Sequence, residues 1–238
     1  MIKMEAIEIN DNPKVICLDI ETANLSMRAE GLYFNNPNGW RTSCVCIYDG
    51  YEGKGYYYVK DPDVVKQKYK EVMDNHPVKE DMFKHLFSFK ELLPMMEDYF
   101  NKGYTLITHN GNSFDLPILS KPIKSGGANL KDIIQRFKKE DRNLDTCAYL
   151  KEKTGYRFRL QYLIKGIVGE TSSKLMDAGN APIEWNNENY LQVLGYCMCD
   201  SIFTYQVYMG VRNNNGCFHS KVKHNKKEFY VDIEGIDW

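Results

Sequence analysis

The stretch Lys14-Val-Ile-Cys-Leu-Asp-Ile-Glu21 decides the fold. It follows Pro13, is rich in β-branched and apolar residues, and ends in acids, which is typical of a buried strand that reaches the edge of a sheet. Residues 42–48 and 55–60 have a similar texture and are separated by the turn-rich segment 49–54. We therefore expect three strands that are at least partly antiparallel, because a short turn joins neighbouring strands in a hairpin.

Helices and a further strand follow this β-rich region. Ser88 and Glu91 form the pattern of a capping box, which predicts the start of a helix. Residues 104–108 predict a fourth strand, and residues 188–210 predict a long amphipathic helix. The tail alternates apolar and polar residues and predicts a terminal hairpin.

The composition is that of a folded chain with its own core. With 238 residues, 43% of them hydrophobic and 26% charged, the sequence excludes disordered and collagen-like proteins. It contains no internal repeat, linker or low-complexity segment. We expect a single α/β domain over residues 1–238, with a core at 13–210 and a C-terminal extension at 211–238.

Charge and hydropathy narrow the classes of partner. The 31 basic and 32 acidic residues nearly cancel, so bulk charge predicts no long-range attraction to nucleic acid. No window approaches the roughly 18 apolar residues of a membrane span, and the N-terminus lacks the apolar core of a signal peptide. We expect a cytoplasmic, intracellular protein with no membrane partner.

The seven cysteines, an odd number, lie mostly in apolar runs and are expected to be buried free thiols. Cys44-Val-Cys46 and Cys197-Met-Cys199 lack the C-x-x-C spacing of common zinc sites. We expect the two side chains of each pair to point apart, and we expect no structural zinc.

The residues that can carry chemistry begin on the first strand. Asp19 and Glu21 are two residues apart, so both side chains project from the same face of a strand. Like charges this close repel and raise each other's pKa unless a cation lies between them. In isolation, the pair is equally compatible with an acid that caps the next segment.

Two further acids follow later in the chain. Asp115 ends the turn that begins at His109 after the fourth strand, and ligands collect at strand ends in open α/β sheets. The alternative is an acid that favours a helix N-terminus. Tyr196 and Asp200 are four residues apart on the long helix and therefore share one face, although a core tyrosine and a solvated aspartate are common.

Together the four carboxylates match the hard oxygen ligands that two Mg²⁺ (or Mn²⁺) ions require, which lie about 3.5–4 Å apart in phosphoryl-transfer sites. In such sites one metal activates the attacking water and the other stabilises the leaving oxygen. A tyrosine beside them can hold that water or help to deprotonate it.

Three motifs thus occur in a fixed order, D-x-E at Asp19, N-x-x-x-F-D at Asn110 and Y-x-x-x-D at Tyr196. This set resembles the DnaQ-like 3′ to 5′ exonucleases of the RNase H-like superfamily, in the branch called DEDDy for its four acids and tyrosine. The middle motif is most similar to the proofreading exonuclease domain of family B DNA polymerases. The resemblance covers residues 15–208. It implies an α/β RNase H-like fold, with a central mixed sheet of three antiparallel strands plus parallel strands, flanked by helices.

The resemblance also implies a role for each motif residue. The family's metal-binding carboxylates correspond to Asp19, Glu21, Asp115 and Asp200, and its water-orienting residue corresponds to Tyr196. The positions near the 3′-terminal nucleotide correspond to Thr22, Ala23, Asn110 and Phe114. Asp145 also matches a recurrent family position, although a helix-starting acid is the simpler interpretation.

Two features lie beside these motifs. The segment 24–41 is longer than a minimal connection, and its Tyr33, Phe34 and Trp40 either stack on bases or cover a core edge. Residues 119–142 hold seven basic residues against three acids, and residues 151–165 hold five against one. Such stretches either neutralise phosphates or form solvated helix faces.

We therefore expect a metal-dependent exonuclease that hydrolyses phosphodiester bonds at the 3′ end of single-stranded or frayed DNA and releases nucleoside 5′-monophosphates. Only the likeness to proofreading domains favours DNA over RNA, so an exoribonuclease of the same branch is the main alternative. A catalytically silent nucleic-acid-binding module and an endonuclease or junction resolvase are further alternatives. No polymerase domain fits in the remaining residues, so we expect either a free-standing nuclease or a subunit whose partner is a polymerase or another replication protein.

Overall fold

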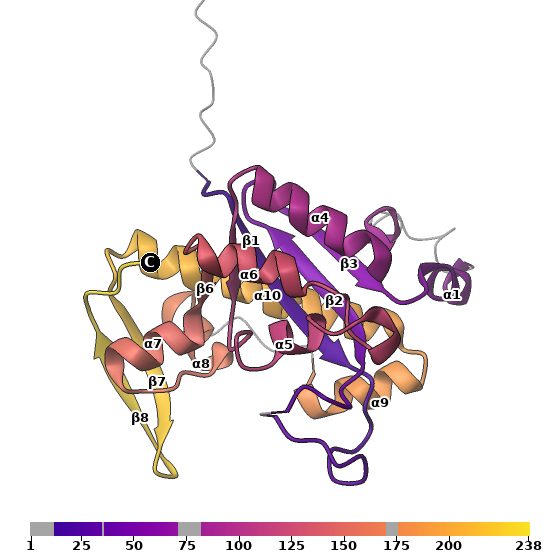
Figure 1. The fold of residues 1–238 in the computed structure, drawn as a ribbon. Helices are drawn as coiled ribbons and strands as arrows, with labels where there is room; N and C mark the ends of the chain where they lie inside the picture. Colours follow the sequence, from indigo (N-terminus) through magenta and orange to yellow (C-terminus); the bar gives the residue numbers. More distant parts are fainter. Residues whose placement is uncertain (1–11, 35, 71–81, 170–175) are drawn as a thin grey trace, which may run out of the picture.

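The computed structural model describes residues 12–34, 36–70, 82–169 and 176–238. Across these residues the chain is an α/β protein built on a six-stranded mixed sheet with helices on both faces (Figure 1). The strands lie in the order β4-β3-β2-β1-β5-β6. Their bounds are β1 (Val15–Thr22), β2 (Thr42–Asp49), β3 (Lys54–Val59), β4 (Leu86–Ser88), β5 (Thr105–Thr108) and β6 (Asn143–Asp145).

The sheet combines antiparallel and parallel pairing around β1. β2 is antiparallel to both β1 and β3. The pairs β1 with β5, β5 with β6, and β3 with β4 are parallel. Within the described sheet, β2 alone therefore runs against the other strands. The predicted antiparallel arrangement of the first three strands is confirmed, and the predicted fourth strand, β5, lies beside β1.

Two short strands, β4 and β6, carry too little sequence signal to be predicted. Each has three residues, and a period of two cannot be recognised over so short a segment. β6 is a strand because it pairs with the edge of β5, where Leu144 lies opposite Ile107. Tertiary pairing rather than a local pattern forms this strand.

Helices cover both faces of the sheet. The capping box predicted for α4 is present, and the Ser88 amide donates to the Glu91 carboxylate at 3.1 Å. No helix in the described ranges is long and apolar enough to cross a membrane. The α-helices are α1 (Pro62–Lys68), α4 (Phe89–Asn101), α5 (Asp115–Leu119), α6 (Lys131–Lys139), α7 (Thr146–Thr154), α8 (Leu160–Ile167), α9 (Ala181–Asn186) and α10 (Tyr190–Asn213).

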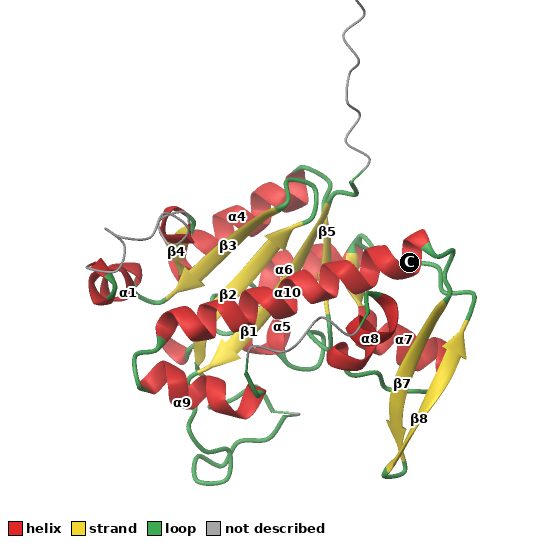
Figure 2. Cartoon of the chain, turned by 180° about the vertical axis from the view of Figure 1, so that it is seen from behind, coloured by secondary structure: helices red, strands yellow, loops and turns green. Residues whose placement is uncertain are grey.

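The two faces of the sheet pack against different helices. On β1, Ile16 and Leu18 belong to the core that includes α4 and α6. Cys17, which points to the alternate face, packs with Tyr208 of α10. Figure 2 shows α10 lying across β1 and β2 on that face. The alternation therefore directs the acids of β1 toward α10.

The expectation that each C-x-C pair points apart is wrong for Cys44 and Cys46. Residues i and i+2 of a strand share a face. Both thiols of β2 meet the thiol of Cys197 on α10, and the three sulfur atoms lie within 4.8 Å of one another. All seven cysteines are free thiols, and all are buried except Cys199, which is half-buried, and Cys217, which is exposed.

An antiparallel hairpin of β7 (Phe218–His224) and β8 (Lys227–Ile233) lies apart from the main sheet and beside α8 (Figures 1 and 2). Phe218 and Val222 are buried in one cluster with Leu163 of α8. The contact is close because position 166 is glycine. A Cβ on Gly166 would lie 1.9 Å from the main-chain oxygen of His219.

Gly166→Ala is expected to disturb this packing, because the added methyl group would meet backbone rather than a flexible side chain. Overpacking of this kind lowers the free energy of unfolding by about 1–3 kcal/mol, which urea denaturation measures. Gly179→Ala is the matched control, since a Cβ there meets nothing within 4 Å. Equal loss of stability in the two variants would contradict a close contact between α8 and β7.

Candidate active site

β1 and α10 bring three acids and a tyrosine together. Asp19 and Glu21 project half-buried from the face of β1 that α10 covers. Tyr196 and Asp200 lie one turn apart on α10 and are buried, with 1% of Tyr196 exposed. Between them, the Cys197 thiol donates a hydrogen bond to the main-chain oxygen of Asp19 (Sγ···O 3.4 Å). The structure thus places the D-x-E and Y-x-x-x-D motifs against each other.

A tight turn after β5 delivers the fourth acid, Asp115, at the start of α5. Asn110 has a left-handed backbone (φ 72°), and a Cβ on Gly111 would lie 2.4 Å from the Cβ of Thr108. The turn therefore requires glycine at this position. Asp115 Oδ1 accepts a hydrogen bond from the Ile20 amide at 3.2 Å. Because Ile20 lies beyond the part of β1 that pairs with β5, the carboxylate takes the place of a strand partner.

Asp145 shapes this turn, a role that sequence reasoning missed. Its predicted function as a helix-starting acid is confirmed, since Oδ1 accepts from the Ala148 amide at 3.1 Å. The same carboxylate also accepts from the amides of Asn110 and Asn112, both at 2.8 Å. The match of Asp145 to a recurrent family position is the sequence signal that points to this second role.

Burial and mutual repulsion make the acids difficult to ionise together. Burial, followed by the charges of Asp115, Asp200 and Glu21, raises the pKa of Asp19 well above its usual range. Burial, opposed by backbone hydrogen bonds and reinforced by Asp145 and Asp200, raises the pKa of Asp115 to about 7. The acids of all three motifs therefore lie close enough to sense one another.

Tyr196 is held in its protonated form. Burial raises the pKa of its hydroxyl, and the carboxylates of Asp200, Glu21 and Asp19 raise the pKa further. A hydrogen bond to Asp200 acts in the same direction. At neutral pH the Tyr196 hydroxyl is therefore a hydrogen-bond donor, and the chemistry it can offer is orientation of a neighbouring group rather than removal of a proton.

The four motif acids offer oxygen atoms of the kind that Mg²⁺ or Mn²⁺ prefers. They are spaced more widely than a closed metal cage. Within the described ranges, the single group of three ligand side chains whose ligand atoms all lie within 4.8 Å of one another consists of the thiols Cys44, Cys46 and Cys197. Thiolates suit softer ions than Mg²⁺.

An open cleft of about 810 Å³ adjoins Asp19 and Asp200. Its lining also contains the cationic side chains Arg157, Arg159 and Lys223. The cleft thus combines an acidic part with a basic part. Two of these cations come from the basic stretch 151–165.

The sequence predicts that the aromatic residues of the segment 24–41 either stack on bases or cover a core edge, and the structure places Phe34 and Trp40 differently. Trp40 is buried and belongs to the main core. Phe34 is 65% exposed, lines the cleft, and has its ring centroid 5.7 Å from that of Trp40 and 5.6 Å from that of Phe114. Trp40 therefore covers a core edge, whereas Phe34 offers a ring to the cleft.

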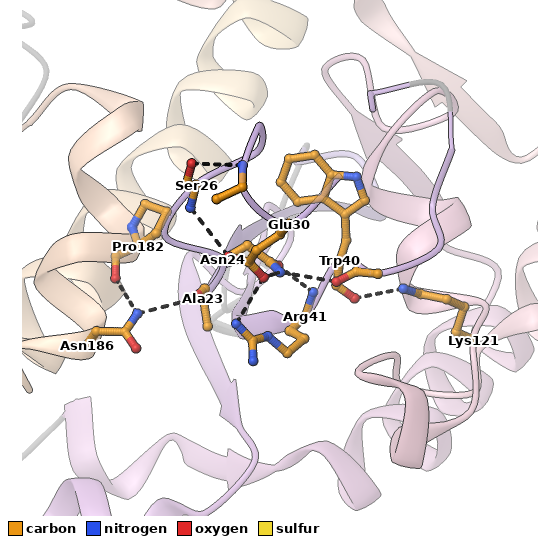
Figure 3. A network of polar contacts seen from close by, with 11 residues as sticks. Ala23, Asn24, Ser26, Glu30, Trp40, Arg41, Lys121, Pro182 and Asn186 are labelled. Carbon is orange, nitrogen blue, oxygen red and sulfur yellow. Dashed lines mark hydrogen bonds and ion pairs between the residues drawn. The ribbon is translucent and has the colours of Figure 1, made fainter. Parts of the chain in front are cut away.

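Partly buried polar contacts hold this segment in place (Figure 3). The buried Asn24 amide donates to the Glu30 carboxylate at 2.6 Å, and its oxygen accepts from the Arg41 amide at 2.7 Å. Lys121 donates to the main-chain oxygen of Trp40 at 2.7 Å. These bonds join the two ends of the segment to each other and to the loop after α5. Phe34 therefore belongs to a segment whose ends are held by hydrogen bonds.

The four residues predicted to lie near the 3′-terminal nucleotide are not all in one cavity. Asn110 and Phe114 line a cavity together with Phe34. Ala23 lines a separate cavity of about 530 Å³. Thr22 is buried at the end of β1. The structure therefore brings two of the four together and separates the other two from them.

Comparison with known families and curated proteins gives no match. No protein-family model matches the chain, and no curated protein matches it. Fold and site define the class of an α/β protein with a mixed sheet and a cleft to which β1 contributes Asp19 and α10 contributes Asp200.

The raised pKa of Asp115 predicts how stability depends on pH. The pKa is about 7 in the folded protein and about 3.9 in an unfolded chain, so the folded state binds this proton more tightly. In EDTA, the free energy of unfolding is therefore expected to fall as the pH rises from about 4 to about 7. Asp115→Asn keeps the oxygen that accepts from Ile20 but has no charge to bury. Its melting temperature should vary less over this range and exceed that of the parent at pH 8.

Thermal unfolding followed by circular dichroism at pH 5.5 and pH 8 measures this difference. Asp132→Asn, which removes an exposed acid on α6, is the control and should follow the parent. The same pH dependence in Asp115→Asn and the parent would show that ionisation of the buried Asp115 carboxylate does not lower the stability of the folded protein.

Proposed function

We propose that this protein is a metal-dependent 3′ to 5′ exonuclease of the DnaQ-like DEDDy type that acts on single-stranded or frayed DNA. The observation that carries the proposal is the convergence of four carboxylates from β1, α5 and α10, with Tyr196 hydrogen-bonded to Asp200. Bringing repelling acids into a partly buried site costs free energy. Bound cations would offset this cost by neutralising the acids, and they would at the same time attract the phosphate of a substrate.

The sheet supports the finer assignment to an RNase H-like fold. In that fold, three antiparallel strands are followed by parallel ones. The order β3-β2-β1-β5-β6 agrees with this, with β5 and β6 parallel to β1. The late helix α10 lies across β1 and β2, and this position supports the assignment of the third motif.

The residues of the site have distinct tasks in phosphodiester hydrolysis. Two Mg²⁺ or Mn²⁺ ions, held by the four motif acids, would supply Lewis-acid stabilisation of the charge that develops on the phosphate oxygens. The protonated Tyr196 hydroxyl orients the water that attacks phosphorus. That water loses a proton to solvent and forms the new P–O bond as the bond between phosphorus and the 3′ oxygen of the preceding nucleotide breaks. The 3′ oxygen takes up a proton, and the terminal nucleotide leaves as a 5′-monophosphate. Asp145 holds the turn that sets the position of Asp115.

The cleft supports a polyanionic substrate. Arg157 donates to the side-chain oxygen of Asn110 at 2.8 Å, so a cation stands beside the turn that carries the middle motif. The exposed ring of Phe34 offers a stacking surface to a base, and such stacking tolerates any base. Phosphate-binding cations combined with an aromatic surface are typical of single-strand binding sites.

Digestion of matched 5′-labelled single-stranded DNA and RNA tests the proposal. With Mg²⁺ or Mn²⁺ we expect a ladder that shortens from the 3′ end, with DNA cut faster, and no cleavage in EDTA. Asp19→Asn should lower the rate by about a thousand-fold, because it removes a carboxylate that would hold the ions that stabilise the transition-state charge. Tyr196→Phe should lower it by about ten- to a hundred-fold, the effect typical of a supporting hydrogen bond.

Asp132→Asn again serves as the control and should cut at the parental rate. Cleavage of RNA but not of DNA would replace the proposed substrate by RNA and retain the reaction. A folded parent that cuts neither strand with either metal would refute the exonuclease and favour a silent binding module. Cleavage at internal sites would indicate an endonuclease.

A further inference from the structure

The C-terminal hairpin contributes a cation to the cleft that contains the acids. Lys223 of β7 lines the same cleft as Asp19 and Asp200, together with Arg159 at the start of α8. The hairpin lies beyond residues 15–208, which carry the three motifs. The exonuclease motifs therefore give it no task.

We propose that Lys223, Arg157 and Arg159 form a binding site for the phosphates of single-stranded DNA on the 5′ side of the nucleotide that is removed. This inference rests on the proposed exonuclease function. If cations held by the acids bind the 3′-terminal phosphodiester, the strand can continue from them only in its 5′ direction. The cations that share the cleft with the acids are then the groups available to the next phosphates.

The three cations are attached to well-packed parts of the fold. Arg157 is held by its hydrogen bond to Asn110 at 2.8 Å. The guanidinium of Arg159 lies 5.5 Å from the ring centroid of Tyr162 on α8. Lys223 belongs to a strand that packs directly on α8, where Gly166 allows backbone contact. Little conformational freedom of the backbone is lost when a strand of DNA binds to such groups.

The acid opposite Lys223 in the hairpin is bound by other groups. Glu228 lies opposite Lys223 in the β7–β8 register. Its carboxylate is contacted by Lys221 at 2.6 Å and by the Tyr162 hydroxyl at 2.8 Å. The acid next to Lys223 is thus bound mainly by other groups, so the charge of Lys223 is available to a phosphate.

The site predicts that binding depends on the length of the strand. A trinucleotide reaches the acids but extends little beyond them, whereas a fifteen-nucleotide strand also passes the cations. Loss of the cations should therefore weaken binding of the longer strand and affect the shorter one little. The logarithm of the binding constant falls linearly with the logarithm of the salt concentration, with a slope of about −0.7 per phosphate contact for a single strand. Two lost contacts should therefore reduce the magnitude of this slope by about 1.4.

Fluorescence anisotropy in Mg²⁺, with 5′-labelled dT15 and dT3 whose 3′-terminal linkage is non-hydrolysable, measures binding without cleavage. The double variant Arg159→Gln with Lys223→Gln should bind dT15 about ten-fold more weakly, with the smaller salt slope, and dT3 within about two-fold. With Mg²⁺, its KM for dT15 should rise while kcat stays at the parental value. Lys223→Gln alone should show a smaller loss, and circular dichroism checks that both variants are folded.

Lys138→Gln with Lys139→Gln is the matched control, because these exposed lysines lie on α6, which packs on the opposite face of the sheet. Its affinity should equal that of the parent. Equal binding of dT15 by the parent and the cleft variant, with DNA still degraded, would overturn this inference and leave the exonuclease intact. An equal loss in the α6 control would overturn it as well, by showing non-specific attraction. Failure of the parent to degrade DNA would refute the proposed function instead.

Discussion

The close contact between α10 and β1 is the constraint on which the site depends. Small thiols lie beside it, between α10 and the neighbouring strand β2, since Cys44 and Cys46 of β2 and Cys197 of α10 are fully buried with their sulfur atoms within 4.8 Å of one another. Larger side chains there would push the helix away from the sheet. The hydrogen bond from Cys197 to the main chain of Asp19 couples the helix directly to the strand that carries the first motif.

This contact brings like charges together at a cost in stability. The structure offsets part of the cost with backbone groups, as in the bond from the Ile20 amide to Asp115. The pKa values of Asp19 and Asp115 nevertheless remain raised, chiefly by burial. Functional sites commonly combine burial with like charges in this way, whereas ordinary surface acids do not. Cations would remove the repulsion, which explains why the arrangement is useful to a phosphoryl-transfer enzyme.

Local patterns predict much of the fold and less of the site. The apolar strand before Asp19, the capping box at Ser88 and the long helix are visible in the sequence because each depends on neighbouring residues. β6 and the second role of Asp145 are not visible, because they arise from pairing with β5 and from bonds to a turn 33 and 35 residues earlier. The alignment of Cys44 and Cys46 was predictable from strand alternation, and the opposite expectation misapplied that rule.

The surroundings of the acids also depend on long-range packing. Phe34 and Trp40 are close in sequence, yet one is exposed to the cleft and the other is buried in the core. Lys223 reaches the cleft because the hairpin folds back beside α8. Sequence composition locates basic residues but does not show which face of the molecule they occupy.

The central claim is that the acids of three separate motifs act as one cation site. Titration with Mn²⁺, followed by the electron paramagnetic resonance signal of the free ion, counts the ions bound by the parent, by Asp115→Asn and by Cys44→Ser. We expect about two ions per chain for the parent and for Cys44→Ser, and fewer, more weakly bound ions for Asp115→Asn. Absence of Mn²⁺ binding to the folded parent, or unchanged binding in Asp115→Asn, would contradict this claim.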